Sequence, residues 1–152
     1  MPLNKALIGK EYPKSVPYEV GREKIRDFAI AIGDHNPIYH DEAAAKAAGY
    51  DDIIAPPTFL TTLGFKFGPQ VVGDPELGLN YAMVVHGEQE FEILRPVKPG
   101  DVLIGTPKIT DITARGKNEF MTYEASITTS SGEKVAIARS IIVSRGTAPQ
   151  EG

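Results

Sequence analysis

The residues best suited to chemistry lie together in the stretch Gly33-Asp34-His35-Asn36-Pro37-Ile38-Tyr39-His40-Asp41, which contains two of the three histidines. A carboxylate and an imidazole a few residues apart, across a turn fixed by proline, can share one water molecule. That is the minimum arrangement for general acid-base catalysis. We therefore take Asp34 and His40 as the candidate catalytic pair. The structural alternatives are a turn or capping role for Asp34 and a loop histidine bonded to the backbone for His40.

Two helices are expected on either side of this stretch. Ile25, Phe28, Ala29 and Ile32 recur at helical spacing, which predicts a helix from about residue 21 with one buried face. Gly33 is a plausible residue to end it. The alanine-rich residues 41–48 predict a second, short helix.

A third predicted helix is apolar nearly all round. Pro57 suits a first helical position, and the helix is expected from Thr58 to about Phe67, ended by Gly68-Pro69. An element of this kind is usually central to a core.

The second half of the chain changes to strand-like alternation. The first strand is expected from about residue 85 to 93. One face has Val85, Gln89, Phe91 and Ile93, and the other, wet face has His86, Glu88, Glu90 and Glu92. We therefore place His86 on the polar face, with a structural or interfacial role. Further strands are predicted at about 102–113, 118–129 and 134–144, and a short one near 18–20. This order predicts an α+β fold in which an antiparallel meander wraps a central helix. Its open edge favours pairing with another subunit.

Composition narrows the classes of function. At 152 residues the chain fits one domain, with its core at about 8–145. The net charge of -4, with no basic run, argues against nucleic acid and anionic membranes as partners. No signal peptide or membrane-spanning run is visible, so we expect a cytoplasmic protein. The chain has no cysteine, and Glu88, Glu90 and Glu92 are expected on a solvated strand face. We therefore expect no metal site.

Three local motifs resemble the MaoC-like family of hot-dog proteins, the (R)-specific enoyl hydratases and 3-hydroxyacyl thioester dehydratases. They are residues 33–41, the loop Ile54-Ala55-Pro56-Pro57-Thr58-Phe59, and the segment from His86 through Arg95-Pro96 to Gly100-Asp101. The chain is most similar to the N-terminal-type half of these dehydratases, as in the small subunits of the actinobacterial (3R)-hydroxyacyl-ACP dehydratase. The resemblance implies a hot-dog fold and carries Asp34 and Asn36 onto the family's Asp-x-Asn-Pro-x-His motif.

The sequence departs from the family pattern at two places. Tyr39 occupies the histidine position of the motif, and His40 follows one residue later. Active members also have a His-Gly pair whose backbone N–H polarises the thioester carbonyl, but Pro56-Pro57 stands there and proline has no N–H. The nearest donors are the amides of Thr58 and Phe59. We therefore assign Asn36, Tyr39, Thr58 and Phe59 as candidate substrate-binding residues.

The resemblance implies a hydro-lyase subunit that acts on acyl-ACP or acyl-CoA in fatty-acid-type metabolism, without a cofactor. One alternative is a non-catalytic, acyl-binding hot-dog subunit that needs a catalytic MaoC-like partner, and both departures favour it. A hot-dog thioesterase is a third possibility, disfavoured by the Asp-x-Asn-Pro turn. Acyl length, the carrier, and homodimer against heterodimer stay open at this point.

Overall fold

The computed structural model describes residues 1–149. The helices are α1 (Arg22–Ala31), α2 (Glu42–Ala47) and α3 (Thr61–Val72), and a 3₁₀ turn, η2 (Pro37–Tyr39), lies between the first two. The strands are β1 (Tyr18–Glu19), β2 (Val84–Ile93), β3 (Val102–Arg115), β4 (Asn118–Thr129) and β5 (Lys134–Ser144). Strand positions agree with the prediction to within about two residues.

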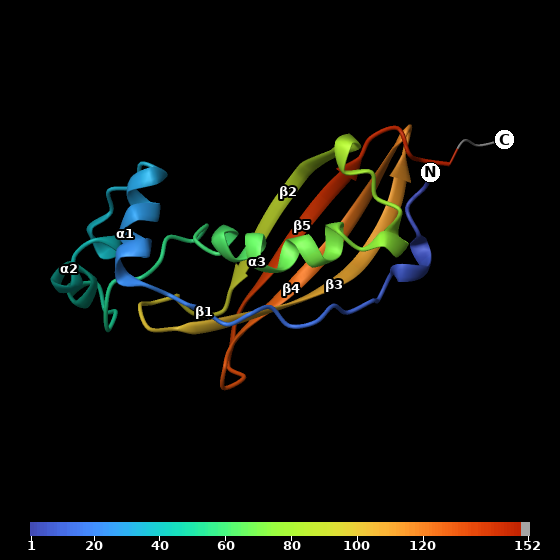
Figure 1. The fold of residues 1–152 in the computed structure, drawn as a ribbon. Helices are drawn as coiled ribbons and strands as arrows, with labels where there is room; N and C mark the ends of the chain where they lie inside the picture. Colours follow the sequence, from blue (N-terminus) through green and yellow to red (C-terminus); the bar gives the residue numbers. More distant parts are fainter. Residues whose placement is uncertain (150–152) are drawn as a thin grey trace.

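One curled antiparallel sheet crosses behind α3, while α1 and α2 lie together beyond one end of the strands (Figure 1). The five strands are ordered β1-β3-β4-β5-β2. This confirms the predicted α+β hot-dog fold. None of the helices within residues 1–149 is long and apolar enough to cross a membrane.

The predicted meander holds for β3, β4 and β5 but not for β2. Strand β2 pairs with β5, at the edge of the sheet, and not with its sequence neighbour β3. The residues between them form a crossing loop, fixed by Arg95 through hydrogen bonds to Asp101 (2.8 Å) and Glu133 (2.9 Å). Strand alternation reports which face is buried but not which strand is the partner, so the sequence did not reveal this pairing.

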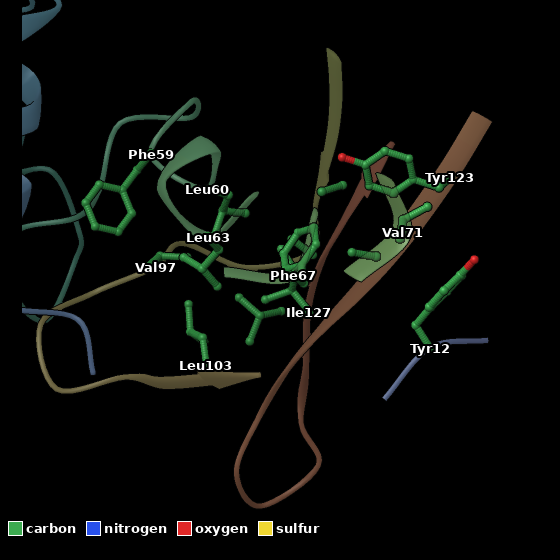
Figure 2. Close-up of a cluster of buried hydrophobic side chains, with 14 of the residues drawn as sticks. Tyr12, Phe59, Leu60, Leu63, Phe67, Val71, Val97, Leu103, Tyr123 and Ile127 are labelled. Carbon is green, nitrogen blue, oxygen red and sulfur yellow. The ribbon is translucent and has the colours of Figure 1, made fainter. Parts of the chain in front are cut away.

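Helix α3 packs its buried face onto the sheet, as Figure 2 shows for Leu63, Phe67 and Val71. It begins at Thr61, not Thr58, and it continues through Pro69 to Val72, so both predicted ends were wrong. Pro69 cannot bond the carbonyl of Phe65 four residues earlier. The Phe65 side chain is 79% exposed, so this face of α3 meets water. We therefore attribute the tolerance of Pro69 inside the helix to solvation of the unbonded Phe65 carbonyl. Burial of Phe67 and Val71 holds the neighbouring turns in place.

A bulge at Gly87 changes the faces of β2. The pairing with β5 shifts between His86 and Glu88, so one extra residue is inserted there. His86 consequently lies on the same face as Gln89 and Phe91, towards α3, and not with the glutamates as predicted. A glycine inside a strand is the sequence signal for such a bulge.

Candidate functional site

Asp34 begins the turn that follows α1. Gly33 has a φ of 72°, a left-handed conformation that suits glycine, and the Asp34 amide donates back to the Ala29 carbonyl at 2.9 Å. The Asp34 carboxylate accepts the Asn36 amide at 3.1 Å, and the Asn36 side chain accepts the Ile38 amide at 3.2 Å. Each side chain therefore has a turn or capping bond, whatever else it does.

His40 follows η2 and points back along the chain. Its Nε2 atom lies 3.0 Å from the main-chain oxygen of Asp34. The Asp34 carboxylate is not its partner. The His40 carbonyl accepts a hydrogen bond from Arg26 of α1 at 3.0 Å. In this conformation the imidazole of His40 bonds to the main chain of its own turn, the His40 carbonyl bonds to α1, and the imidazole forms no hydrogen bond with the Asp34 carboxylate.

Tyr39 points into a mostly apolar cavity of about 250 Å³, which we call the proximal cavity. The tyrosine is only 7% exposed. Burial raises the pKa of its phenol, and the nearby charges of Asp34 and Tyr50 raise it further. The lining residues are Ile38, Tyr39, Tyr50, Ile54, Ala55, Pro56, Pro57, Phe59, Leu60, Ile93, Pro96 and Val97.

The turn from Pro56 to Leu60 precedes α3 at the side of this cavity. The Phe59 amide donates to the Pro56 carbonyl at 2.9 Å, so it is already used, and the Phe59 ring packs edge-on against Phe28 of α1 with 5.5 Å between centroids. Thr58 is exposed, and its amide has no acceptor within residues 1–149. Because α3 starts three residues later than predicted, neither amide belongs to its first turn.

The structure thus brings only part of the candidate set together. Tyr39 and Phe59 line the proximal cavity, whereas Asp34, Asn36, His40 and Thr58 are not among its lining residues. Their roles in catalysis or binding stay predictions.

Sequence reasoning missed three lining residues from distant segments, Tyr50, Ile93 and Val97. Val97 is held against the site by its carbonyl, which accepts the Ala55 amide at 2.7 Å. No local sequence pattern predicts this contact, because it depends on the path of the crossing loop.

The family assignment follows from sequence comparison over most of the chain. A family model described as "FAS1-like, dehydratase domain region" matches residues 6–138. The chain belongs to this family. One relative, called UPF0336 protein, from Saccharopolyspora erythraea, is 54% identical over 148 residues, which is 97% of this chain and 95% of the relative.

Solved structures agree with this assignment. A MaoC-like dehydratase has 31% identity and a TM-score of 0.84, with 92% of this chain covered, although this chain spans only 42% of that longer protein. A chain of the HadBC (3R-hydroxyacyl-ACP dehydratase) complex from Mycobacterium tuberculosis has 29% identity and a TM-score of 0.77, with 90% of this chain and 96% of that chain covered. These neighbours support the MaoC-like resemblance of the sequence.

Proposed function

We propose that this chain is the substrate-binding subunit of a (3R)-hydroxyacyl-thioester dehydratase, or (R)-specific enoyl hydratase, whose catalytic Asp-His pair comes from a MaoC-like partner. The observation that carries the proposal is the orientation of two neighbouring residues. Tyr39, at the family's histidine position, faces the proximal cavity, while His40 bonds to the backbone of its own turn.

The chemistry of hydration explains why a tyrosine at the histidine position matters. Addition of water to C3 of an enoyl thioester needs a base to take a proton from water and an acid to protonate C2. A phenol with a raised pKa keeps its proton at neutral pH. Tyr39 is therefore suited to donate a hydrogen bond to a bound substrate and unsuited to act as the base.

The proximal cavity favours an aliphatic acyl group. Its walls are largely proline, isoleucine, leucine and phenylalanine side chains, and two tyrosines contribute polar hydroxyl groups. Sites of this composition usually bind apolar ligands and orient them through a few polar groups. An acyl group on coenzyme A or acyl carrier protein has the matching chemistry.

The edge strand β2 favours a different chain as partner. Glu88, Glu90 and Glu92 lie on its outward face. The nearby cation Arg139 is already bonded to Glu90 (2.5 Å) and Glu124 (2.8 Å). Antiparallel pairing of two identical β2 strands would bring these carboxylates opposite one another, which costs free energy. A partner with a less acidic edge avoids this cost.

A second candidate is a subunit that is active alone, through Asp34 and His40. The Thr58 amide favours it, because among residues 1–149 this donor has no acceptor, and it lies between two lining residues of the cavity, Pro57 and Phe59. It would require His40 to leave its backbone partner and turn towards the substrate.

The test of the proposal is binding of octanoyl-CoA, a saturated thioester that cannot be hydrated, measured by calorimetry with the purified chain and with its complex with a co-expressed MaoC-like protein. We expect binding that weakens about three- to tenfold in Tyr39→Phe, because a buried hydrogen bond is lost. Absence of binding by both the chain and the complex would contradict the proposal. Release of free coenzyme A would indicate a thioesterase.

A further inference from the structure

Two tyrosines bring polar side-chain groups to the otherwise apolar proximal cavity. Its other lining residues within the described chain, 1–149, are aliphatic, proline or phenylalanine side chains, which carry no hydrogen-bonding atom. Tyr39 ends η2, and Tyr50 follows Gly49, which ends α2 with a left-handed φ of 96°. Both tyrosines therefore come from the helical segment that lies beyond one end of the strands (Figure 1).

The main chain holds the two tyrosines in place without help from their phenol groups. The Tyr50 amide donates to the Ala45 carbonyl at 3.0 Å. The Ile54 amide donates to the Ile38 carbonyl at 3.2 Å, which joins the segment after Tyr50 to the turn that carries Tyr39. Because these backbone bonds position both residues, the phenol groups are not needed to fold this part of the chain.

Both phenol oxygens are open to a ligand. Neither forms a hydrogen bond within residues 1–149, and neither is among the fully buried side-chain oxygens that lack a partner, although Tyr39 as a residue is only 7% exposed. Burial, above all, and then the charges of Asp34 and Tyr50 raise the pKa of the Tyr39 phenol, so this group keeps its proton at neutral pH. The influence of Tyr50 on this pKa also indicates that the two phenols are neighbours.

The main chain around the cavity has few donors to offer. Pro56 and Pro57 line it and have no N–H. The amides of Ile54, Ala55 and Phe59 already donate to carbonyl groups. A ligand acceptor inside the cavity therefore depends on the two phenol O–H groups.

A thioester offers a suitable acceptor to this pair of donors. Its carbonyl oxygen has two lone pairs and can accept two hydrogen bonds, whereas its sulfur is a weak acceptor. Ile93, the last residue of the edge strand β2, also lines the cavity. A thioester bound here would consequently lie close to the edge that a partner chain would cover.

We propose that Tyr39 and Tyr50 together bind the carbonyl oxygen of the acyl thioester, each by donating one hydrogen bond to it. This inference rests on the proposed function, because it takes the ligand to be an acyl thioester. A ligand of similar shape without the carbonyl would leave both phenols unpaired in an apolar cavity. Tyr50 is thus a specificity-determining residue, as Tyr39 is.

The experiment compares octanoyl-CoA with S-octyl-CoA, a thioether that has a methylene group in place of the carbonyl. Calorimetric titration is carried out with the chain and with its complex with a MaoC-like partner. The wild type should bind octanoyl-CoA about tenfold more tightly than the thioether. Tyr39→Phe and Tyr50→Phe should each lower this preference about threefold, and the double variant should bind the two ligands within about twofold of each other.

Infrared spectroscopy separates hydrogen bonding from a purely structural effect of the substitutions. A hydrogen bond to a carbonyl oxygen lowers the stretching frequency of the carbonyl. With octanoyl-CoA labelled with carbon-13 at the carbonyl, the bound ligand should therefore show a higher frequency in each single variant than in the wild type, and the highest in the double variant. A change of packing alone would not shift this band.

Two other tyrosines provide matched controls. Tyr12 is exposed to the same extent as Tyr39, 7%, but its hydroxyl donates to Asp74 at 2.7 Å. Tyr18, in β1, is half-buried like Tyr50. Neither control residue lines the proximal cavity. Tyr12→Phe and Tyr18→Phe should keep the wild-type preference for octanoyl-CoA.

Equal binding of the two ligands by the wild type would overturn the inference and leave the proposed function standing. A preference that persists in the double variant would overturn it also, because the carbonyl would then be bound by another donor, such as the Thr58 amide. Loss of the preference in either control variant would overturn it too, since the effect would be general. Failure of octanoyl-CoA to bind to the chain and to the complex would remove the proposed function and this inference together.

Discussion

Tyr39 and His40 are adjacent in the chain and have different surroundings. In an extended segment, neighbouring side chains would point to opposite faces. The segment is instead the 3₁₀ turn η2, in which successive side chains diverge by about a third of a turn. Tyr39 is therefore buried, while His40 turns back to the Asp34 carbonyl.

This geometry gives a prediction for His40. Within the described part of the chain, residues 1–149, the His40 imidazole bonds only to the main chain of its own turn. His40→Ala should therefore lower the free energy of unfolding by about 0.5–1.5 kcal/mol. The affinity for octanoyl-CoA should stay within about twofold, since a main-chain anchor contributes to folding more than to binding. Urea denaturation and calorimetry measure the two effects. A tenfold loss of affinity at unchanged stability would place His40 on the ligand instead.

Asp74 provides a pH-dependent contribution to stability. Hydrogen bonds from Lys10, above all, and from Tyr12 hold the pKa of this carboxyl below its ordinary value of 3.8. The folded state therefore favours the ionised form, and the resulting stabilisation is full well above pH 3.8 and disappears as the pH falls through the lower, folded-state pKa.

We accordingly expect Asp74→Asn to be less stable than the wild type at pH 7, and the gap to narrow in unfolding curves recorded below pH 3.8. Glu11→Gln serves as the control, because Glu11 is exposed and forms no ion pair within residues 1–149. A gap of constant size across this range would show that the charge of Asp74 is not responsible.

At the scale of elements, the contact between α3 and β3 depends on one missing side chain. Gly105 of β3 lies directly under Phe67, and a Cβ atom there would lie 2.4 Å from the ring. This contact fixes the height of α3 above the sheet. Leu60, which directly precedes α3, lines the proximal cavity.

Gly105→Ala should consequently destabilise the protein by about 1–3 kcal/mol, because a methyl group would overpack the core. Gly64→Ala, on α3, meets no atom within 4 Å and should instead stabilise the protein, by about 0.5–1 kcal/mol. Thermal or urea unfolding of the two variants checks both signs. An unaffected Gly105→Ala variant would mean that α3 shifts freely over the sheet.

The elements also show what the sequence could predict. Alternation and turn residues located β3, β4 and β5 and the end of α1 at Gly33, because these signals are local. The continuation of α3 through Pro69 depends on its packing against the sheet, and the pairing of β2 with β5 depends on the crossing loop. The motif located the candidate turn, but the orientation of His40 depends on a backbone acceptor that no spacing rule specifies.

For the whole molecule, the acidic face of β2 should limit self-association. The purified chain should form a homodimer weakly, and more readily at high salt, which screens the repulsion between exposed charges. Glu88→Lys should strengthen the homodimer, since each lysine would face carboxylates of the other copy. Glu11→Lys changes the net charge equally at a residue that bridges to β3, away from β2. Sedimentation velocity distinguishes these cases, and a tight wild-type homodimer insensitive to salt and to Glu88→Lys would contradict the charge argument.

In the proposed function, this chain binds the acyl thioester and its partner performs the chemistry. The most direct measurement is the rate of hydration of trans-2-octenoyl-CoA by the purified chain, by a co-expressed MaoC-like partner, and by their complex, with Asp34→Asn and His40→Ala introduced into this chain. We predict no turnover by the chain alone, and turnover by the complex that stays within about threefold in both variants. A catalytic acid or base contributes about 10²–10⁴ in rate. Turnover by the chain alone that falls by such a factor in either variant would contradict the account.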